Sequence, residues 1–404
     1  MSSFLKIDFV SILHCNLDMK YLRELSKTIR QVKSSILLIG PRQTGKSTLI
    51  KSLNPDLVIN LSQEKSFIRF SSQPDLLEEI IAQEKPSSVF IDEIQRLPSL
   101  LNTIQSIIDS SSKKIKFYLT GSSARKLRRG SANLLPGRVI SLNMAPLTLE
   151  EINYDYHIDQ AMAFGLLPGI FTEKNTKERV LLLSSYGATY LKEEIQAEAL
   201  TKNIEGFSRF LFVAAAKNGE FLDYAKMGAQ ANIAQKTATR FFDILEDSLI
   251  VFRLNSYAKD SFRRLVQHPK YYFFDTGVLN SLVGSYRVAA ERKGMLFETF
   301  VITAVRNMLL AKAIQFELCT YRSTGGAEVD LILKTEGCEF AIEVKASKNV
   351  GKSDLIGLKS FSEVSKNNPV KLVIYMGEYS RKIEDVSILP LNQAMKLLSK
   401  SISS

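Results

Sequence analysis

The sequence predicts a multidomain α/β protein, with a parallel sheet first, a helical region next and a second, smaller α/β unit last. Over the first 121 residues, four short apolar runs alternate with helix-like segments, which is the pattern of strands and crossover helices in a parallel sheet. After Arg138 the pattern is mainly helical up to about residue 202. Strand-like runs return beyond residue 315, after a long amphipathic segment that begins near residue 294.

The apolar runs of the first unit are short enough to be buried strands. The first of them, SSILLIG, leads into a glycine-containing loop and then into the helix-like segment STLIKSL. Residues 205–255 indicate three helices and a strand pair, and the last unit indicates one long helix followed by strands. We therefore place the units, in chain order, at 1–145 (parallel-sheet core), 146–202 (helical lid), 203–256 (winged-helix-like), 257–290 (connector) and 291–390 (small α/β domain).

Composition narrows the classes of protein that the chain can be. Its 53 lysines and arginines exceed its 42 acidic residues, giving a net charge of +11, which is compatible with an anionic partner such as nucleic acid. Three cysteines and three histidines are too few and too scattered for a disulfide framework or a zinc site. The N-terminus lacks a signal-peptide core, and no apolar run reaches the ~18 residues that span a bilayer. We expect a cytoplasmic protein without a membrane partner.

The segment GPRQTGKS at residues 40–47 matches the phosphate-binding pattern GxxxxGK[ST], with a strand before it and a helix after it. In such a loop the glycines let backbone N–H groups wrap a phosphate, the lysine reaches the β- and γ-phosphate oxygens, and the serine hydroxyl binds Mg²⁺. ATP and Mg²⁺ are therefore the expected cofactors. The residues predicted to bind them here are Gly40, Pro41, Arg42, Gln43, Thr44, Gly45, Lys46, Ser47 and Thr48.

A second part of the same site is predicted in SSVFIDEIQRLP at residues 87–98. Asp92 ends a buried strand and is placed to hold the magnesium, while Glu93 is the natural group to polarise an attacking water. The later strand IKFYLTGSS ends in hydroxyl residues, of which we favour Ser122 over Thr120 and Ser123 as the phosphate contact. Arg138 either stabilises the transition state, in its own chain or from a neighbouring subunit of a homo-oligomer, or is a surface residue.

These segments resemble a known family. GPRQTGKSTL, VFIDEIQRLP, YLTGSSARKL, LPGR and GLLPGIF are similar to segments of AAA+-type ATPases of bacteria and archaea that carry a C-terminal domain of unknown function with a restriction-endonuclease-like fold. The resemblance covers the chain from about residue 20 to about residue 380 and implies ATP binding and hydrolysis. Ser47 stands where that family often has threonine, and the hydroxyl of either residue can bind Mg²⁺. PKYYFFDTG at 269–277 also resembles the family; there we expect Asp275 to cap a turn.

The middle of the chain contains a predicted helix-turn-helix. In EFLDYAKMGAQANIAQKTATRFFDILED (220–247), a helix, a turn around residues 229–232 and a second helix from Ala234 precede the wing-like segment LIVFRLNSY. The exposed face of the second helix would carry Gln235, Lys236, Thr239 and Arg240, in the place from which such helices contact DNA. Alternatively, the unit packs only as a linker, with Phe241, Ile244 and Leu245 as its core face.

GGAEVDLILKTEGCEFAIEVKAS at residues 325–347 predicts a second site. Its two strands form a hairpin, with Asp330 on the first and Glu343 and Lys345 on one face of the second, because strand residues two apart point the same way. Glu298, on the preceding helix, could complete a carboxylate cluster of the kind that holds Mg²⁺ in nucleases. The arrangement resembles the PD-(D/E)XK nuclease core, although an E-x-K triplet is also common on solvated strands and such cores persist as inactive binding modules.

Three functional hypotheses remain open on the sequence, and one of them, an oligomeric motor, requires Arg138 to act across subunits. In the first, an ATPase couples its nucleotide state to a nuclease-like domain that binds nucleic acid, with Glu93, Arg138, Asp330, Glu343 and Lys345 as catalytic residues and Ser47, Asp92, Glu298, Asp330 and Glu343 as metal ligands. In the second, the chain is an ATP-controlled binding switch for a protein or nucleic acid and has no nuclease activity. The sequence does not choose between DNA and RNA.

Overall fold

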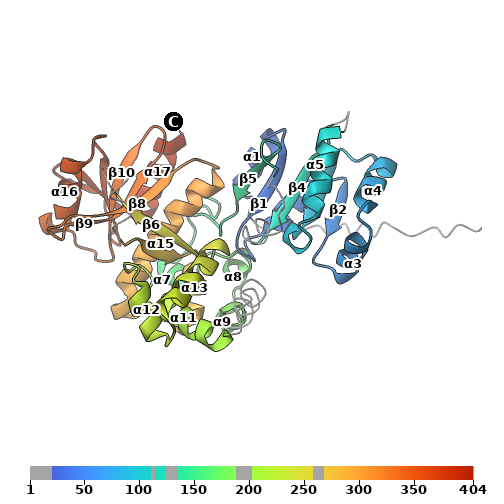
Figure 1. Ribbon diagram of the computed structural model, residues 1–404. Coiled ribbons are helices and arrows are strands. Elements are labelled where there is room, and N and C mark those ends of the chain that lie inside the picture. Colours follow the sequence, from blue (N-terminus) through green and yellow to red (C-terminus); the bar gives the residue numbers. More distant parts are fainter. Residues whose placement is uncertain (1–20, 111–113, 123–134, 188–202, 258–267, 404) are drawn as a thin grey trace, which may run out of the picture.

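The computed structural model describes residues 21–110, 114–122, 135–187, 203–257 and 268–403. Figure 1 shows the first sheet, in blue and cyan, at one end of the molecule and the C-terminal sheet, in orange and red, at the other. The yellow-green helices of the middle segment lie beside the C-terminal sheet, and one hydrophobic core runs through both.

The first unit is the predicted parallel α/β sheet. Its strands lie in the order β2-β3-β4-β1-β5, and every pairing among them is parallel. Separate hydrophobic clusters cover its two faces, as expected for a sheet with crossover helices on both sides. The elements are β1 (Ser35–Ile39), β2 (Leu57–Asn60), β3 (Ser88–Asp92), β4 (Lys116–Gly121) and β5 (Val139–Asn143), with α1 (Leu25–Gln31), α2 (Lys46–Lys51), α3 (Glu64–Ser72), α4 (Leu76–Glu84) and α5 (Leu100–Ser110).

The middle segment is helical. It comprises α7 (Ile158–Phe164), α8 (Pro168–Thr172), α9 (Thr176–Ser185), α11 (Ile204–Ala216), α12 (Tyr224–Gln230), α13 (Gln235–Asp247) and α14 (Thr276–Val283). The pair α12 and α13 lies where the sequence predicts a helix-turn-helix. The side chains of Phe241, Ile244 and Leu245 are buried, while Gln235, Lys236 and Arg240 are exposed and Thr239 is half-buried.

The strand after α13 differs from the expectation of a wing. β6 (Val251–Ser256) pairs antiparallel with β7 (Lys270–Phe273) and parallel with β8 (Glu317–Arg322), so it is an inner strand of the C-terminal sheet. The apolar residues of VFRLNS explain the difference, because four of its six side chains are buried. The segment that the sequence suggests to be a wing thus joins the middle segment to the last unit.

The C-terminal sheet has eight strands in the order β12-β13-β11-β10-β9-β8-β6-β7. β9 (Glu328–Lys334) and β10 (Glu339–Lys345) form the predicted antiparallel hairpin, with Leu331 opposite Ile342. Alternate residues of these strands face two different cores, one beneath α15 and α17 and one beneath α16. The remaining elements are β11 (Val370–Tyr375), β12 (Arg381–Ile383), β13 (Val386–Pro390), α15 (Ala290–Ala311), α16 (Ile356–Val364) and α17 (Leu391–Ser403).

Helix α15 is long and apolar enough, by length and composition, to cross a membrane, and it is the one such helix in the described part of the chain. The sequence has no uninterrupted apolar run of that length, because Glu298 and Arg306 divide the apolar residues of α15. Within its most apolar window, 72% of the residues are buried inside the protein. The helix packs on β10 and α17, which explains its apolar surface as that of a core helix.

Two of the sequence segments noted above meet at Asp275. Its carboxylate accepts hydrogen bonds from the backbone N–H groups of Gly277 (2.9 Å) and Val278 (3.1 Å) at the start of α14, which confirms the predicted cap. It also accepts one from Leu166 N–H at 2.8 Å, in the segment GLLPGIF. Burial raises the pKa of Asp275 to about 6, against the effect of these three backbone donors. The carboxylate therefore fixes α14 against α7.

Candidate functional site

The loop at residues 40–47 lies at the carboxyl end of β1 and leads into α2. A Cβ atom at Gly40 would stand 2.4 Å from the carbonyl oxygen of Met144, so only glycine fits beside β5. Gly45 has φ +93°, a conformation that glycine adopts without strain. The Lys46 ammonium donates to the carbonyl oxygens of Gly40 (2.8 Å) and Pro41 (2.9 Å), so it lies inside the loop.

The two predicted magnesium ligands are in direct contact. The Ser47 hydroxyl donates to Asp92 Oδ1 at 2.7 Å, and the Thr120 hydroxyl donates to the same oxygen at 2.5 Å. Asp92 is 6% exposed at the end of β3. A hydroxyl and a carboxylate, both at the carboxyl edge of the sheet and beside the phosphate loop, are the oxygen donors that Mg²⁺ uses with nucleotides, so these residues fit the ion.

Glu93 and Ser122 are brought together by a residue that the sequence analysis did not select. The Gln95 amide donates to Ser122 Oγ at 2.9 Å and also to a carboxylate oxygen of Glu93. Ser122 Oγ lies 3.4 Å from the same Glu93 oxygen. Glu93 has φ +58°, a left-handed conformation that is uncommon outside glycine and that turns the chain sharply after β3. Thr120 contacts Asp92, and Ser123 lies outside the described residues.

Arg138 lies away from this group of residues. Arg138 directly precedes β5, and the first residue of β5 pairs with the first residue of β1. Arg138 therefore lies at the amino ends of these strands, whereas the phosphate loop follows the carboxyl end of β1. Its guanidinium makes a two-pronged contact with Asp109 at 2.6 Å and 2.8 Å. Within one chain, the structure therefore does not bring Arg138 to the predicted phosphate site. Its action on a neighbouring subunit stays a prediction.

Arg23 connects the phosphate loop to the start of the middle segment, and sequence reasoning missed it. Its guanidinium donates to the carbonyl oxygens of Thr44 (2.6 Å) and Ala145 (2.7 Å). It also forms an ion pair with Glu151 at 3.1 Å, and both side chains are almost fully buried. The backbone of the loop and the segment leading toward α7 are thus held by one side chain. No local pattern marks such an arginine, because its partners lie far along the chain.

The second predicted site lies on the hairpin of the C-terminal sheet. Lys345 pairs with Glu343 at 2.9 Å, and the Val344 N–H donates to Asp330 Oδ2 at 2.8 Å. Asp330, Glu343 and Lys345 are therefore close together, as the sequence predicts. Burial raises the pKa of Asp330 well above its ordinary value, and the Glu343 and Glu298 carboxylates add to this effect.

Three further residues join this cluster, and the sequence analysis named none of them. The Lys270 ammonium, on β7, contacts Glu328 (2.5 Å), Glu298 (3.6 Å) and Asp330 (4.0 Å). The Tyr272 hydroxyl donates to Glu298 Oε1 at 2.6 Å. Burial lowers the pKa of Lys270, but the surrounding carboxylates outweigh burial and the net shift is upward. Lys270 is thus a charged residue at the centre of the cluster.

The carboxylates of this cluster do not form a ready metal site. Among the described residues, no three histidine, cysteine, aspartate or glutamate side chains are grouped so that they could hold a metal ion. The position between Glu298, Glu328 and Asp330 is taken by the Lys270 ammonium. Glu298, Asp330 and Glu343 therefore lie in one neighbourhood, as predicted, but they do not converge as ligands of one ion in this arrangement.

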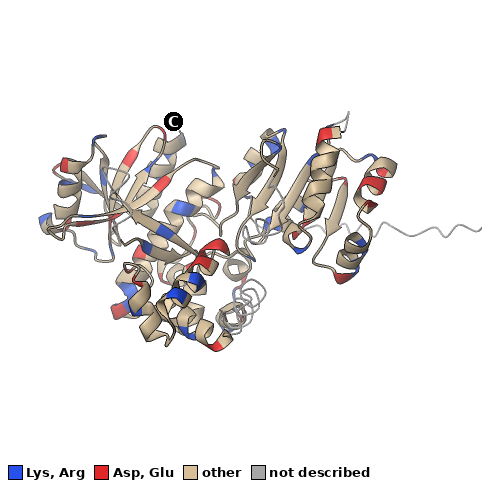
Figure 2. Cartoon of the chain, viewed as in Figure 1, with Lys and Arg blue, Asp and Glu red and all other residues tan. Residues whose placement is uncertain are grey.

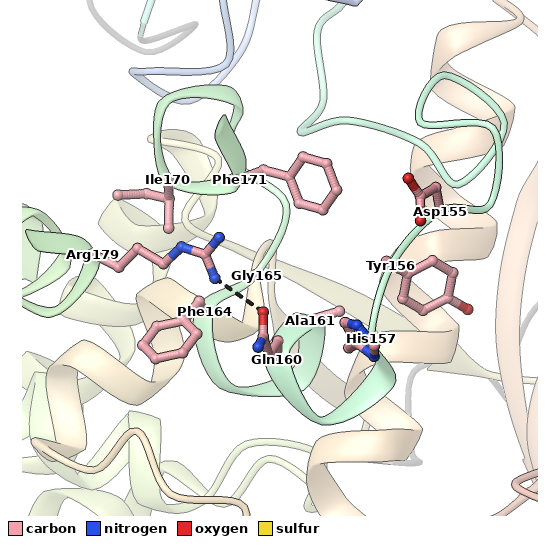
Figure 3. A pocket seen from close by; sticks show the side chains of 10 residues that line it. All are labelled: Asp155, Tyr156, His157, Gln160, Ala161, Phe164, Gly165, Ile170, Phe171 and Arg179. Atoms are coloured by element: carbon pink, nitrogen blue, oxygen red, sulfur yellow. Dashed lines mark hydrogen bonds between the residues drawn. The ribbon is translucent and has the colours of Figure 1, made fainter. Parts of the chain in front are cut away.

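A separate pocket of about 150 Å³ lies on the middle segment, between α7, α8 and α9. Figure 3 shows Arg179 and Phe171 at its sides and the hydrogen bond from Arg179 to Gln160, of 3.3 Å. The Phe171 ring also makes an edge contact with Tyr21, just before α1, at 5.7 Å between centroids. The pocket shares no lining residue with the phosphate loop or the carboxylate cluster, so it is a third feature of the fold.

Comparison with known proteins agrees with the geometry of the first site. Residues 32–153 match a family model described as an AAA domain. The N-terminal part of the chain is thus similar to an AAA domain. Residues 155–287 and 293–394 match two models described as domains of unknown function, DUF8612 and DUF4143. The AAA-type domain supports nucleotide binding and an ATPase, and the two following models assign no activity.

Relatives of this chain occur in bacteria and archaea. An uncharacterized protein of Mycobacterium tuberculosis is 25% identical over 375 residues, which cover 89% of this chain and 80% of the relative. One of Methanocaldococcus jannaschii is 21% identical over 392 residues, covering 88% and 85%. Among solved structures, a replication initiator DnaA bound to AMPPCP and single-stranded DNA matches with a TM-score of 0.25 and 9% identity, over 55% of this chain and 86% of that one.

Proposed function

We propose that this protein binds and hydrolyses ATP and that its nucleotide state controls how the middle and C-terminal units bind nucleic acid. The observation that carries the ATPase proposal is the contact between Ser47 and Asp92 beside the phosphate loop, with Glu93 next in the chain. A phosphate-binding lysine, a hydroxyl–carboxylate pair for Mg²⁺ and a second carboxylate for the attacking water are the parts that hydrolysis requires.

Each of these residues has a distinct role in the reaction. Lys46 exchanges its two loop carbonyl partners for phosphate oxygens when the nucleotide binds. Ser47 and Asp92 would hold Mg²⁺, and the ion would supply positive charge to neutralise the phosphates. Glu93 accepts a hydrogen bond from the attacking water and orients it, because its carboxylate lies at the same edge of the sheet. Gln95 and Ser122 fix the position of that carboxylate.

Coupling between the units is supported by a continuous set of contacts. Arg23 joins the phosphate loop at Thr44 to the carbonyl oxygen of Ala145. Two residues further on, the Leu147 N–H donates to the carbonyl oxygen of Leu166 at 2.9 Å, and the Leu166 N–H donates to Asp275. A shift of the loop on nucleotide binding would therefore reach α14 and the strand β7 that precedes it.

Replacing Lys46 with alanine should abolish ATP hydrolysis and weaken ATP binding by at least about tenfold, because a charge-assisted contact to phosphate is worth about 1.5–3 kcal/mol. Steady-state phosphate release and equilibrium binding of a fluorescent ATP analogue would measure both effects. Lys51→Ala is the matched control, since Lys51 is exposed at the far end of the same helix. Hydrolysis by Lys46→Ala at the wild-type rate would refute this assignment.

The exposed residues of α13 support nucleic-acid binding by the middle segment. Figure 2 shows ribbon segments coloured for lysine or arginine on α12 and α13, and Lys236 and Arg240 are both exposed on α13. The double variant Lys236→Ala/Arg240→Ala should bind oligonucleotides more weakly and lower the slope of log K against log salt by about 1–2, because about two phosphate contacts are lost. Fluorescence anisotropy over a salt series, with DNA and RNA, would measure this. An unchanged affinity and slope would exclude α13 from the interface.

A second function, a binding switch without nuclease activity, is favoured by the position of Lys270 among the carboxylates. Cleavage of labelled single- and double-stranded DNA and RNA, with Mg²⁺ or Mn²⁺ and with or without ATP, separates the two. Cleavage that is lost in Glu343→Ala and altered in Lys46→Ala would establish an ATP-controlled nuclease. ATP hydrolysis without any cleavage would favour the switch.

A further inference from the structure

The carboxylate cluster of the C-terminal sheet is built from two parts of the chain that match different family models. Glu298, Glu328, Asp330 and Glu343 lie within residues 293–394, whereas Lys270 and Tyr272 lie within residues 155–287. Lys270 is 6% exposed, and its ammonium contacts three of the four carboxylates. The cluster is therefore complete only when β7 of the middle segment is present.

Lys270 is positioned where carboxylates would otherwise repel one another. A buried cluster of like charges needs a cation close by, since charge–charge energies grow as water is excluded. Lys345 neutralises Glu343 on one side of the cluster, at 2.9 Å. On the other side, the Lys270 ammonium neutralises charge on Glu298, Glu328 and Asp330. The ammonium thus takes the place in which a divalent cation would contact the same oxygens.

One carboxylate oxygen of the cluster, Oε2 of Glu343, can accept a further interaction. Glu343 is 8% exposed, and its buried Oε2 atom has no hydrogen-bond partner among the residues that the structure describes, although Oε1 contacts Lys345. A buried carboxylate oxygen without a partner is unusual, because leaving it unsatisfied costs about 1–3 kcal/mol. The carboxylates also outnumber the ammonium groups around them. The cluster therefore keeps negative charge that a divalent cation could neutralise once the Lys270 ammonium is removed.

The strand that carries Lys270 is held by the middle segment. The Leu222 N–H donates to the carbonyl oxygen of Pro269 at 2.8 Å, and the Gly219 N–H donates to that of Tyr271 at 2.9 Å. Lys270 forms an isolated bridge with Phe221, and its ammonium lies 5.4 Å from the centre of that ring. The position of the ammonium is thus set by the loop that follows α11. Movement of that loop would move Lys270 relative to β9 and β10.

We propose that Lys270 is the resident cation of this carboxylate cluster and that its ammonium excludes a divalent cation from the position between Glu298, Glu328 and Asp330. A divalent ion and an ammonium within about 4 Å of the same carboxylates repel each other strongly in a site that excludes water. The two therefore compete. The proposal deepens the function proposed for the C-terminal unit, but it concerns cation binding in the absence of nucleotide and does not depend on ATP hydrolysis.

The test uses the full chain without nucleotide and with Mn²⁺ as the probe. Lys270→Met keeps an unbranched side chain of similar length and removes the charge. This variant should bind Mn²⁺ at least about tenfold more tightly than wild type in a titration followed by electron paramagnetic resonance, corresponding to about 1.4 kcal/mol. Mn²⁺ should also raise the melting temperature of Lys270→Met more than that of wild type, since binding to the folded state stabilises it.

Three controls assign the effect to the cluster. Lys334→Met removes a lysine from the same sheet that pairs with Glu317 at 3.9 Å, so it should bind Mn²⁺ as wild type does. Lys270→Met/Asp330→Asn should lose the gained affinity. If Lys270→Met does not fold, a comparison of Mn²⁺ binding by wild type and Asp330→Asn still tests the proposal. Asp330→Asn should leave Mn²⁺ binding by the otherwise wild-type chain unchanged, because Lys270 already excludes the ion.

The proposal is overturned if wild type binds Mn²⁺ saturably at a site that Asp330→Asn removes, or if Lys270→Met binds Mn²⁺ no better than wild type. Neither result bears on ATP hydrolysis, which the Lys46→Ala variant tests at a different site. Conversely, if wild type fails to hydrolyse ATP while Lys270→Met gains Mn²⁺ binding, the proposed ATPase is refuted and the exclusion of divalent cations by Lys270 is supported.

Discussion

Replacing Glu93 with glutamine should lower kcat for ATP hydrolysis by about 10²–10⁴-fold, which is the usual contribution of a positioned general base. ATP binding should stay close to wild type, because Lys46, Ser47 and the loop backbone are untouched. Glutamine has nearly the same shape as glutamate and lacks only the charged acceptor. Single-turnover hydrolysis, together with equilibrium binding of ATP, separates the chemical step from affinity.

The control for this variant is Glu64→Gln, which changes a glutamate that is mostly exposed and pairs with Arg96 at 2.8 Å. It should hydrolyse ATP at the wild-type rate. Loss of binding as well as hydrolysis in Glu93→Gln would mean that Glu93 supports the loop instead of the water. In that case Gln95 and Ser122, which contact Glu93, would have a structural role only.

Replacing Gly165 with alanine should destabilise the fold by about 3 kcal/mol or more, an effect typical of steric overlap at a special backbone conformation. Gly165 has φ +71° and ψ −165°, a region open almost only to glycine. An added Cβ would stand 2.0 Å from Asp275 Oδ1, so the carboxylate that caps α14 would be displaced. Urea denaturation followed by circular dichroism would measure the loss.

The matched variant is Gly169→Ala, four residues further along the chain. A Cβ at Gly169 would meet no atom within 4 Å, and the residue lies in α8, where alanine is preferred over glycine. This variant should be as stable as wild type or slightly more stable. Equal stability of Gly165→Ala and wild type would show that the hydrogen bond from Leu166 N–H to Asp275 does not hold the middle segment together.

The first site could be predicted from sequence because its parts follow buried strands. In a parallel sheet the carboxyl ends of the strands share one edge, so Ser47, Asp92 and Ser122 were expected to lie together before any contact was known. The side chains that position them were not predictable. Arg23 reaches Glu151, 128 residues away, and Gln95 is an ordinary residue in a short 3₁₀ turn. Such contacts depend on packing between units and leave no periodic signal.

The C-terminal site was predicted in part for a related reason. Asp330, Glu343 and Lys345 lie on one hairpin, so their proximity follows from local pairing. Lys270 is separated from Asp330 by 60 positions in the chain and lies on a different strand, β7. Its role depends on the parallel pairing of β6 with β8. Pairing between strands so distant in sequence leaves no local pattern. This is why the sequence suggests a wing at residues that form β6, an inner strand of the C-terminal sheet.

The shared sheet limits how these units can be recombined in evolution. The two matched regions meet between residues 287 and 293, whereas the eight-stranded sheet crosses that border from β7 and β6 to β8. A gene fusion that moved only the last unit to another protein would leave an inner edge of β8 unpaired, and unpaired edges promote aggregation. The two regions are therefore expected to be inherited as one piece, and a lineage that loses one should lose the other.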